Sequence, residues 1–376
     1  MEIQKVQTKQ ALMRFIHFPH QLYKNDENYV PELNMITEKM LSKKNPFLKH
    51  SEIALFLAIK DGNVLGRIAA IYNKTHLETY RDNTGFFGFF DSVEDRLVAE
   101  KLFKTCEQWL GERGIKRVTG PANLTTNDSC GFLLEGFQYP PMVMMPYNKA
   151  YYNWLCTQSG FTKLMDLNSY LMDTCFSFEK YGKIYSRSMD FMKTNRIKIR
   201  NLSEKTFQTD IAKLRPVYNK VNENNWGFMP LNDEEFYAMA EDLKTATPFD
   251  LTLIVEKEDE IVGFLIAVPN LNQAFQFIKN GKLFPLGILK LLYYQRKIDT
   301  ARIMILGVLD EYKSMGIDLV LYKSIQAAFE KRNIITSEAC YVLESNQRMN
   351  SILKKLSNGI IKKYRIYEKE IHLQKP

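Results

Sequence analysis

The sequence predicts a mixed α/β protein in which two similar domains follow one another along the chain. The first observation is a hairpin-like pattern at Ile59 to Ala70 that recurs 197 residues later, at Glu256 to Ala267. The second is that both copies lead into the same order of elements: a strand, a long helix, a strand, a shorter helix and closing strands. The third is the length of 376 residues, which is ample for two hydrophobic cores. A repeat this long indicates duplicated domains rather than a solenoid.

Composition indicates a folded globular protein of a reducing compartment. Hydrophobic residues make up 45% of the chain and charged residues 25%. The five cysteines are scattered without metal-ligand spacing, which favours a cytoplasmic protein without a metal site. No apolar run is long enough to span a bilayer, and the N-terminal residues are too polar for a signal peptide.

The net charge of +8 predicts an anionic partner. Coenzyme A, an anionic membrane surface and nucleic acid would all satisfy this charge. Nucleic acid ranks last, because the chain has no arginine-studded helix, no zinc-finger spacing and no aromatic RNA-binding signature.

The first half opens with a short strand and two helices before the first hairpin. Pro19 is expected to interrupt the first of these helices. The turn Asp61-Gly62-Asn63 favours a hairpin, because its residues tolerate the left-handed backbone conformation. The expected elements are a strand Glu2 to Val6, helices Lys9 to Tyr23 and Pro31 to Leu41, and strands Glu52 to Lys60 and Val64 to Asn73.

A further strand, Gly85 to Phe90, and a long helix, Val93 to Arg113, follow the first hairpin. Ser92 is expected to cap this helix, with Asp95 at its third position. The helix entry holds three carboxylates and no glycine, so it is unsuited to a diphosphate. The first domain is therefore expected to keep the fold without binding the cofactor.

The connection from Gly120 to Tyr147 is too long for an ordinary loop of a compact domain, which points to a function. It is rich in methionine and aromatic residues, which make an adaptable apolar lining for an acyl chain or a hydrophobic amine. The alternative is that these side chains fill the interface between the two halves. They are Phe132, Phe137, Tyr139, Met142, Met144 and Met145.

The division between the domains is expected near residue 180, so that they cover residues 1–179 and 180–376. Asn232 or Asp233 is expected to cap the helix that follows an asparagine-rich loop. The second half should contain a strand Ile197 to Leu202, a helix Ser203 to Val221, strands Leu251 to Val255, Ile261 to Val268 and Ala301 to Leu309, and a helix Lys313 to Arg332.

An insertion at residues 269–298, placed in the second domain, has no counterpart in the first half. It mixes basic with bulky apolar residues and contains no acidic residue, a pattern typical of an interfacial helix on an anionic bilayer. The alternative is a buried helix whose lysines reach outward to solvent. The basic residues are Lys279, Lys282, Lys290, Arg296 and Lys297.

The strand Ile303 to Leu309 leads into the segment Lys313-Ser314-Met315-Gly316-Ile317-Asp318 and then into the long helix. A basic residue and a glycine before a helix turn backbone N–H groups toward one point, where the helix dipole favours anions. The segment resembles the coenzyme A loop of the GNAT acyltransferase superfamily, Arg/Gln-x-x-Gly-x-Gly/Ala. Lys313 and Gly316 match this motif, and Asp318 stands where the family usually has glycine or alanine.

The resemblance implies two tandem GNAT-like domains, each a mixed, mostly antiparallel sheet flanked by helices. It implies a coenzyme A thioester, acetyl-CoA or a longer acyl-CoA, as acyl donor in the second domain, and an acceptor in the first. The residues implied for cofactor binding are Val308 and Leu309 along the pantetheine arm and Lys313, Ser314, Met315, Gly316 and Ile317 around the diphosphate.

The helix from Asn148 to Ser159 also resembles GNAT members, which often carry Asn-x-x-Ala-x-x-Leu-Tyr before Gly-Phe. Leu155, and Leu353 in the second copy, take the place of the tyrosine that often acts as general acid. The catalytic groups are therefore sought around the long first-domain connection. The candidate bases are Asp128 and Glu135, and the candidate acids are Tyr147, Tyr151 and Tyr152.

Together these features predict an acyl-CoA-dependent N-acyltransferase that acts on a small-molecule or lipid-like amine. The basic insertion predicts peripheral contact with an anionic membrane, at the inner membrane surface for a cytoplasmic protein. Two alternatives stay open. One is a GNAT-fold binding protein without catalysis, and the other is an aminoacyl-tRNA-dependent transferase of tandem-GNAT architecture.

Overall fold

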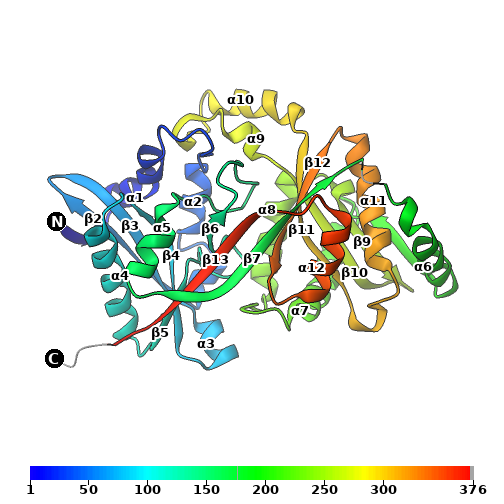
Figure 1. The fold of residues 1–376 in the computed structure, drawn as a ribbon, viewed down its shortest axis with the longest axis horizontal. Helices are drawn as coiled ribbons and strands as arrows, with labels where there is room; N and C mark the ends of the chain where they lie inside the picture. Colours follow the sequence, from blue (N-terminus) through cyan, green and yellow to red (C-terminus); the bar gives the residue numbers. More distant parts are fainter. Residues whose placement is uncertain (176, 373–376) are drawn as a thin grey trace. The chain divides into compact units, whose positions relative to one another are not determined.

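The computed structural model describes residues 1–175 and 177–372, which form two compact units (Figure 1). Unit 1 comprises Met1–Leu167, Asn272–Arg296 and the residues from Lys362 onward, and unit 2 comprises Asn168–Leu271 and Lys297–Ile361. The limits fall within β7 (Thr162–Asp173) and β13 (Ile360–Glu370), so each of these strands supplies residues to both units. Most of the insertion belongs to unit 1, whereas the sequence assigned it to the second domain. The division near residue 180 stays a prediction.

Unit 1 is a mixed sheet flanked by helices, with strand order β1-β2-β3-β4-β5-β13 and with β6 pairing β13. The ladder between β4 and β5 is parallel, and the ladders from β1 to β4 are antiparallel. Its other strands are β1 (Glu2–Lys5), β2 (Glu52–Lys60), β3 (Asn63–Tyr72), β4 (Thr84–Ser92), β5 (Arg117–Gly120) and β6 (Phe132–Glu135). Its α-helices are α1 (Lys9–Leu22), α2 (Asn34–Met40), α3 (Lys74–Tyr80), α4 (Arg96–Gly111), α5 (Tyr151–Gln158), α9 (Asn272–Phe275) and α10 (Gly287–Tyr294).

The long helix α4 starts later than expected. It begins at Arg96, and the Asp95 carboxylate accepts from the Leu97 N–H at 2.8 Å. Ser92, the expected cap, is instead the last residue of β4, where it pairs with Gly66 of β3. The expectation for Ser92 was wrong because the strand ladder holds this residue in an extended conformation.

Pro19 does not interrupt helix α1, which runs through it to Leu22. A proline inside a helix has no N–H to donate to the carbonyl four residues earlier. That carbonyl belongs to Phe15, and it accepts instead from Nη1 of Arg67 at 2.9 Å. The proline therefore leaves a buried acceptor that holds the Arg67 guanidinium group.

Unit 2 repeats the arrangement of unit 1, with strand order β7-β12-β11-β10-β9-β8. A hairpin, β9–β10, precedes β11, then the long helix α11, and then β12 parallel to β11. This order confirms the predicted tandem fold. The strands are β8 (Ile197–Asn201), β9 (Thr252–Lys257), β10 (Glu260–Pro269), β11 (Thr300–Val308) and β12 (Thr336–Leu343). The helices are α6 (Gly182–Thr194), α7 (Phe207–Asn222), α8 (Asp233–Ala246), α11 (Ile317–Lys331) and α12 (Gln347–Leu356).

Helix α8 begins where the sequence predicted. The Asn232 side chain accepts from the Glu235 N–H at 2.9 Å, and the Glu235 carboxylate accepts from the Asn232 N–H at 3.1 Å. The prediction of Asn232 as the cap is confirmed.

Within the described residues, none of the helices has both the length and the apolar character needed to cross a bilayer.

Candidate active site

Unit 1 contains a cavity of about 230 Å³ between α1, α2, β4, the long connection after β5, and α9. One part of its lining is polar and includes titratable groups, and the rest is apolar. The polar residues include His20, Tyr29, Glu32, Arg67, Asp91 and Asn123. The apolar residues include Phe89, Phe90, Phe132, Val143, Met144 and Met145. Of the apolar set predicted from the sequence, Phe132, Met144 and Met145 reach this cavity.

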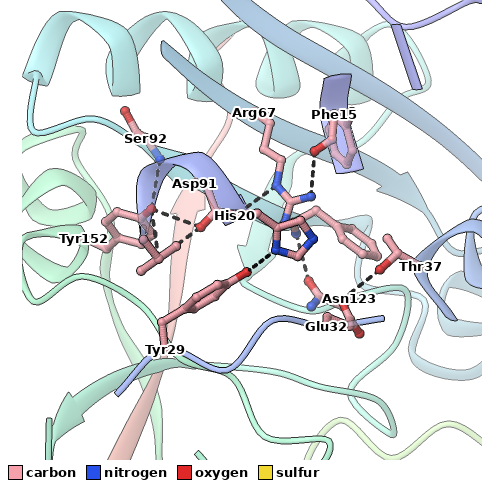
Figure 2. A network of polar contacts seen from close by, with 12 residues as sticks. Phe15, His20, Tyr29, Glu32, Thr37, Arg67, Asp91, Ser92, Asn123 and Tyr152 are labelled. Atoms are coloured by element: carbon pink, nitrogen blue, oxygen red, sulfur yellow. Dashed lines mark hydrogen bonds and ion pairs between the residues drawn. The ribbon is translucent and has the colours of Figure 1, made fainter. Parts of the chain in front are cut away.

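A buried ion pair between Arg67 and Asp91 forms one wall of the cavity (Figure 2). Nε of Arg67 donates to Oδ2 of Asp91 at 2.7 Å, while Nη1 holds the Phe15 carbonyl. Burial raises the pKa of Asp91, and the Arg67 guanidinium group opposes that shift. A guanidinium group with two fixed acceptors is a rigid support for the carboxylate beside it.

Two buried tyrosines complete the shell around Asp91. The Tyr152 hydroxyl donates to Oδ1 of Asp91 at 3.0 Å and accepts from the Ser92 N–H at 3.0 Å. The Tyr23 hydroxyl lies 3.1 Å from both Oδ1 of Asp91 and the Tyr152 oxygen. Burial raises the pKa of both phenols well above the usual value. Both hydroxyl groups therefore stay protonated at neutral pH and act as donors inside the network.

His20 is buried and its tautomer is fixed by its neighbours. Nδ2 of Asn34 donates to the Asn280 carbonyl at 2.9 Å, so Oδ1 of Asn34 accepts from Nε2–H of His20 at 2.9 Å. Nδ1 of His20 then accepts from the Tyr29 hydroxyl at 3.0 Å (Figure 2). Burial lowers the pKa of His20 to about 4, so the ring is neutral at physiological pH.

Glu32 is the carboxyl group that the cavity leaves accessible. The residue is exposed, and it is part of the lining of the cavity. The Thr37 hydroxyl donates to its Oε2 at 3.0 Å, which fixes the side chain (Figure 2). The surrounding protein desolvates the group and raises its pKa, although Thr37 and Arg67 oppose the shift. A carboxylate with a raised pKa, open on one side to a cavity, is suited to proton transfer.

The predicted catalytic residues divide between the cavity and other places. Tyr147 lines the cavity and donates to Asp26 at 2.9 Å, and Tyr152 belongs to the buried network. The Asp128 carboxylate accepts from Thr125, at 2.7 Å from its hydroxyl oxygen. The Glu135 carboxylate pairs with Lys363 Nζ at 2.6 Å on the surface. Neither Asp128 nor Glu135 lines the cavity.

The strand before the predicted cofactor loop has a partly open edge. The β11–β12 ladder spans Thr300–Ile303 and Thr336–Ala339, whereas the β11–β10 ladder continues to Val308. In unit 1 the corresponding edge of β4 is taken by the chain itself. The Ala122 N–H donates to the Phe87 carbonyl at 2.8 Å, and the Phe89 N–H donates to Asn123 Oδ1 at 2.8 Å. Of these two edges in the described residues, the β11 edge beyond Ile303 therefore offers its main chain to an extended ligand, whereas the β4 edge does not.

The predicted diphosphate loop ends in Gly316, whose φ of +74° is left-handed and which precedes the first turn of α11. A Cβ at this position would lie 2.1 Å from Ser188 Oγ of α6, so glycine is needed for the packing of α6. The Asp318 carboxylate accepts from the Leu319 N–H in the first turn of α11 at 2.9 Å and lies 3.5 Å from Arg348, which balances its charge. Lys313 pairs with Asp310.

In residues 1–175 and 177–372, no group of three or more His, Cys, Asp or Glu side chains is arranged to hold a metal ion.

Two proteins of known name align with almost the whole chain. Protein YghO of Escherichia coli (strain K12) is 35% identical over 370 residues, covering 96% of this chain and 94% of that protein. A bacterial ceramide synthase of Caulobacter vibrioides (strain NA1000 / CB15N) is 31% identical over 376 residues, covering 97% of this chain and 96% of that protein. No family model matches the chain.

Solved structures show the same tandem architecture. A tandem GNAT protein from the clavulanic acid biosynthesis pathway superposes with a TM-score of 0.58 at 8% identity, and the alignment covers 100% of both chains. The chain belongs to the family of protein YghO and the bacterial ceramide synthase, and it has the tandem GNAT fold. A GCN5-related N-acetyltransferase from Sphaerobacter thermophilus superposes with a TM-score of 0.55 at 12% identity, covering 99% of this chain and 96% of that one. At such identities these GNAT structures establish the fold alone.

Most residues of this candidate site could not be found from the sequence. His20, Glu32, Arg67 and Asp91 come from four separate segments that only the fold brings together. One local signal was available, since Pro19 inside a helical pattern marks a carbonyl without its helical partner. Glu32 had no signal, because it lies before helix α2 in a stretch that was read as part of the helix itself.

Proposed function

We propose that the protein is an acyl-CoA-dependent N-acyltransferase whose acceptor is a lipid-like amine bound in the cavity of unit 1. The observation that carries this proposal is the combination of the desolvated Glu32 carboxyl group with an apolar, methionine-containing wall in one cavity. The relative named bacterial ceramide synthase supports the choice of acceptor. Ceramide is an amide of a long-chain amino alcohol, so its formation is an N-acylation.

The charge balance of the cavity favours a cationic ligand. Asp91 and Glu32 contribute two carboxyl groups, Arg67 contributes one cation, and His20 is neutral. An ammonium group that enters would lie near Glu32, whose raised pKa brings it closer to neutral pH. Glu32 would remove the proton, and the free amine would then attack the acyl carbonyl carbon. Asp91 is a poorer base, since Arg67 and two tyrosines already occupy its oxygen atoms.

The size of the cavity limits what it holds. Its volume of about 230 Å³ lies below the range of roughly 300–1,000 Å³ that is usual for small-molecule sites. It therefore suits the amine head group and the first carbon atoms, while a long chain extends beyond it.

The acyl donor is assigned to unit 2 by the predicted residues Val308, Leu309 and Lys313 to Ile317. The β11 edge beyond Ile303 supports this assignment, because amide groups of a pantetheine arm can bond to a free strand edge. The N-terminus of α11 after Gly316 supports it as well, since its dipole favours a diphosphate. When bound, coenzyme A supplies the thioester carbonyl and the leaving thiolate.

A turnover assay with matched amines tests this function. The purified protein is incubated with palmitoyl-CoA and either a long-chain amino alcohol or ethanolamine. Thiol release and the mass of the amide product are then measured. We expect turnover of the long-chain amine and little of ethanolamine, because only the former fills the apolar wall. Equal rates would overturn the lipid-like acceptor, and an absence of thiol release with every amine and acyl-CoA tried would overturn the enzymatic function.

A further inference from the structure

Helix α10 carries bulky apolar side chains on the surface of unit 1 (yellow in Figure 1). The buried-helix alternative is therefore excluded for α10. We call this region the α10 surface. Its exposed apolar residues, with their exposed fractions, are Phe284 (67%), Leu286 (68%), Leu289 (63%), Leu292 (48%) and Tyr293 (57%). Such a cluster on one short segment is typical of an interaction site.

Contacts with the preceding part of the insertion hold the α10 surface in place. The Tyr294 ring stacks on Phe277 with centroids 3.7 Å apart. Nζ of Lys290 donates to the Phe277 carbonyl at 3.0 Å. A Cβ at Gly287 would lie 2.5 Å from the Lys282 carbonyl, so the helix starts tightly against the chain before it. The apolar face is therefore presented by a supported helix.

The basic residues beside the α10 surface determine which kind of partner can bind there. Lys282, Lys290 and Arg296 are exposed beside the apolar residues, and residues 269–298 contain no acidic side chain. A second copy of this chain, meeting the same face about a two-fold axis, would bring these cations together. An anionic bilayer accepts both the apolar side chains and the cations.

The same insertion also builds the cavity. Asn272 and Phe275 line it, and Nδ2 of Asn272 donates to the Pro141 carbonyl at 3.0 Å. A Cβ at Gly281, where φ is +63°, would lie 2.1 Å from the Glu32 carbonyl. The segment that carries the α10 surface thus packs directly on the residue assigned as the base.

We propose that the α10 surface docks on an anionic lipid bilayer, and that the docked enzyme takes its amine from that bilayer into the adjacent cavity. The second half rests on the proposed function. A cavity that holds only the head group leaves the hydrocarbon chain in the lipid. The apolar side chains would enter the acyl boundary while the basic residues contact lipid phosphates.

Vesicle flotation tests the docking. The full-length protein is mixed at low ionic strength with vesicles of phosphatidylcholine alone or with added phosphatidylglycerol. We expect binding to the anionic vesicles only, reduced about tenfold by Leu289→Ser with Leu292→Ser, and reduced similarly by Lys282→Gln with Lys290→Gln. The matched control is Leu97→Ser with Lys104→Gln on α4, where Leu97 is 67% exposed. This control should bind as the parent protein does.

Activity separates the two halves of the proposal. Acylation of a vesicle-embedded amine should fall with both α10 variants, while acylation of a water-soluble amine whose chain is just long enough to fill the apolar wall should not. Binding to vesicles without acylation of any amine would contradict the proposed function and leave the docking intact. Absence of vesicle binding by the parent protein would overturn the docking. So would unchanged vesicle binding in the α10 variants, or a dimer of the parent protein that Leu289→Ser with Leu292→Ser converts to a monomer.

Discussion

Glu32 is the residue on which the proposed chemistry depends most directly. Replacing it by Gln keeps the contact with Thr37 but removes the proton acceptor. We expect kcat to fall by about 10²- to 10⁴-fold, the usual contribution of a general base, with little change in KM for the acyl donor. Steady-state kinetics at several pH values would show this. Asp128→Asn is the matched control, because Asp128 lies outside the cavity lining. A fall with Asp128→Asn and none with Glu32→Gln would reverse the assignment.

His20 couples folding to pH. Burial lowers the pKa of His20 to about 4 in the folded chain, whereas the unfolded chain has the ordinary value of 6.5. Between these values the unfolded chain binds a proton that the folded chain does not. Protonation of His20 therefore favours the unfolded chain in this range. The free energy of unfolding keeps its full value above pH 6.5 and falls by about 3 kcal/mol as the pH falls toward 4.

The non-titrating variant His20→Gln should remove this dependence. Urea unfolding of the parent protein and of the variant, measured across the acidic range, gives the difference in slope. We expect the parent to lose more stability than the variant as the solution becomes more acidic. Parallel curves would mean that the pKa of His20 is the same in the folded and the unfolded protein.

Arg67 supplies the positive charge that balances the buried Asp91 carboxylate. Its side chain is 10% exposed and that of Asp91 is 9% exposed. Arg67→Met should destabilise the protein by about 3–5 kcal/mol, because it leaves Asp91 without its cation. Adding Asp91→Asn to Arg67→Met should restore a large part of that loss. Denaturant unfolding of the two single variants and the double variant measures the coupling, and additive effects would contradict it.

At the scale of elements, the contact between the insertion and the segment before α2 that contains Glu32 depends on a glycine. Gly281→Ala would force a left-handed alanine against the Glu32 carbonyl. Gly62, with φ of +79°, has open space around its missing Cβ and provides the control. We expect Gly62→Ala to cost about 1–2 kcal/mol, for backbone strain alone. Gly281→Ala should cost more and also lower kcat. Equal losses of stability with unchanged kcat would show that this contact does not position Glu32.

The elements also show where reading the sequence succeeds and where it does not. The capping box of α8 and the two hairpins are local patterns, and each was predicted correctly. The start of α4 was wrong because pairing of Ser92 with β3 overrode its capping preference. Pro19 was misread for a similar reason, since a distant arginine satisfies the carbonyl that the proline leaves open. Local sequence patterns therefore predict that an element forms, whereas contacts with distant residues decide where it begins and ends.

At the scale of the molecule, the two units divide the proposed work, and coenzyme A binding tests that division. Lys313→Gln should weaken binding of an acyl-CoA about tenfold, as expected for the loss of one charge-assisted hydrogen bond. Its folding should be nearly unchanged, because the Asp310 partner is 66% exposed. Lys331→Gln, at the other end of α11, is the control. Calorimetry that finds equal affinity for both variants would remove the loop from the site.

The tandem fold was predictable because duplication leaves a long-range signal in one sequence. The candidate site was not, because its residues combine α1, the segment before α2, β3, β4 and the insertion. Each of these residues is ordinary in its own stretch. Arg67 and Asp91 lie in strands whose other residues form the core, and the sequence gives no sign that they face each other.

The path of β13 has a consequence for how the protein is made. Within unit 1, β5 and β6 both pair with this strand, and Lys363 meets Glu135 across a separation of 228 positions. The ribosome therefore releases that partner long after β5 and β6. Unit 1 is completed only after Ile361, the last residue of unit 2, has been made, and until then the edges of β5 and β6 stay uncovered. Nascent chains should need protection by a chaperone until β13 emerges.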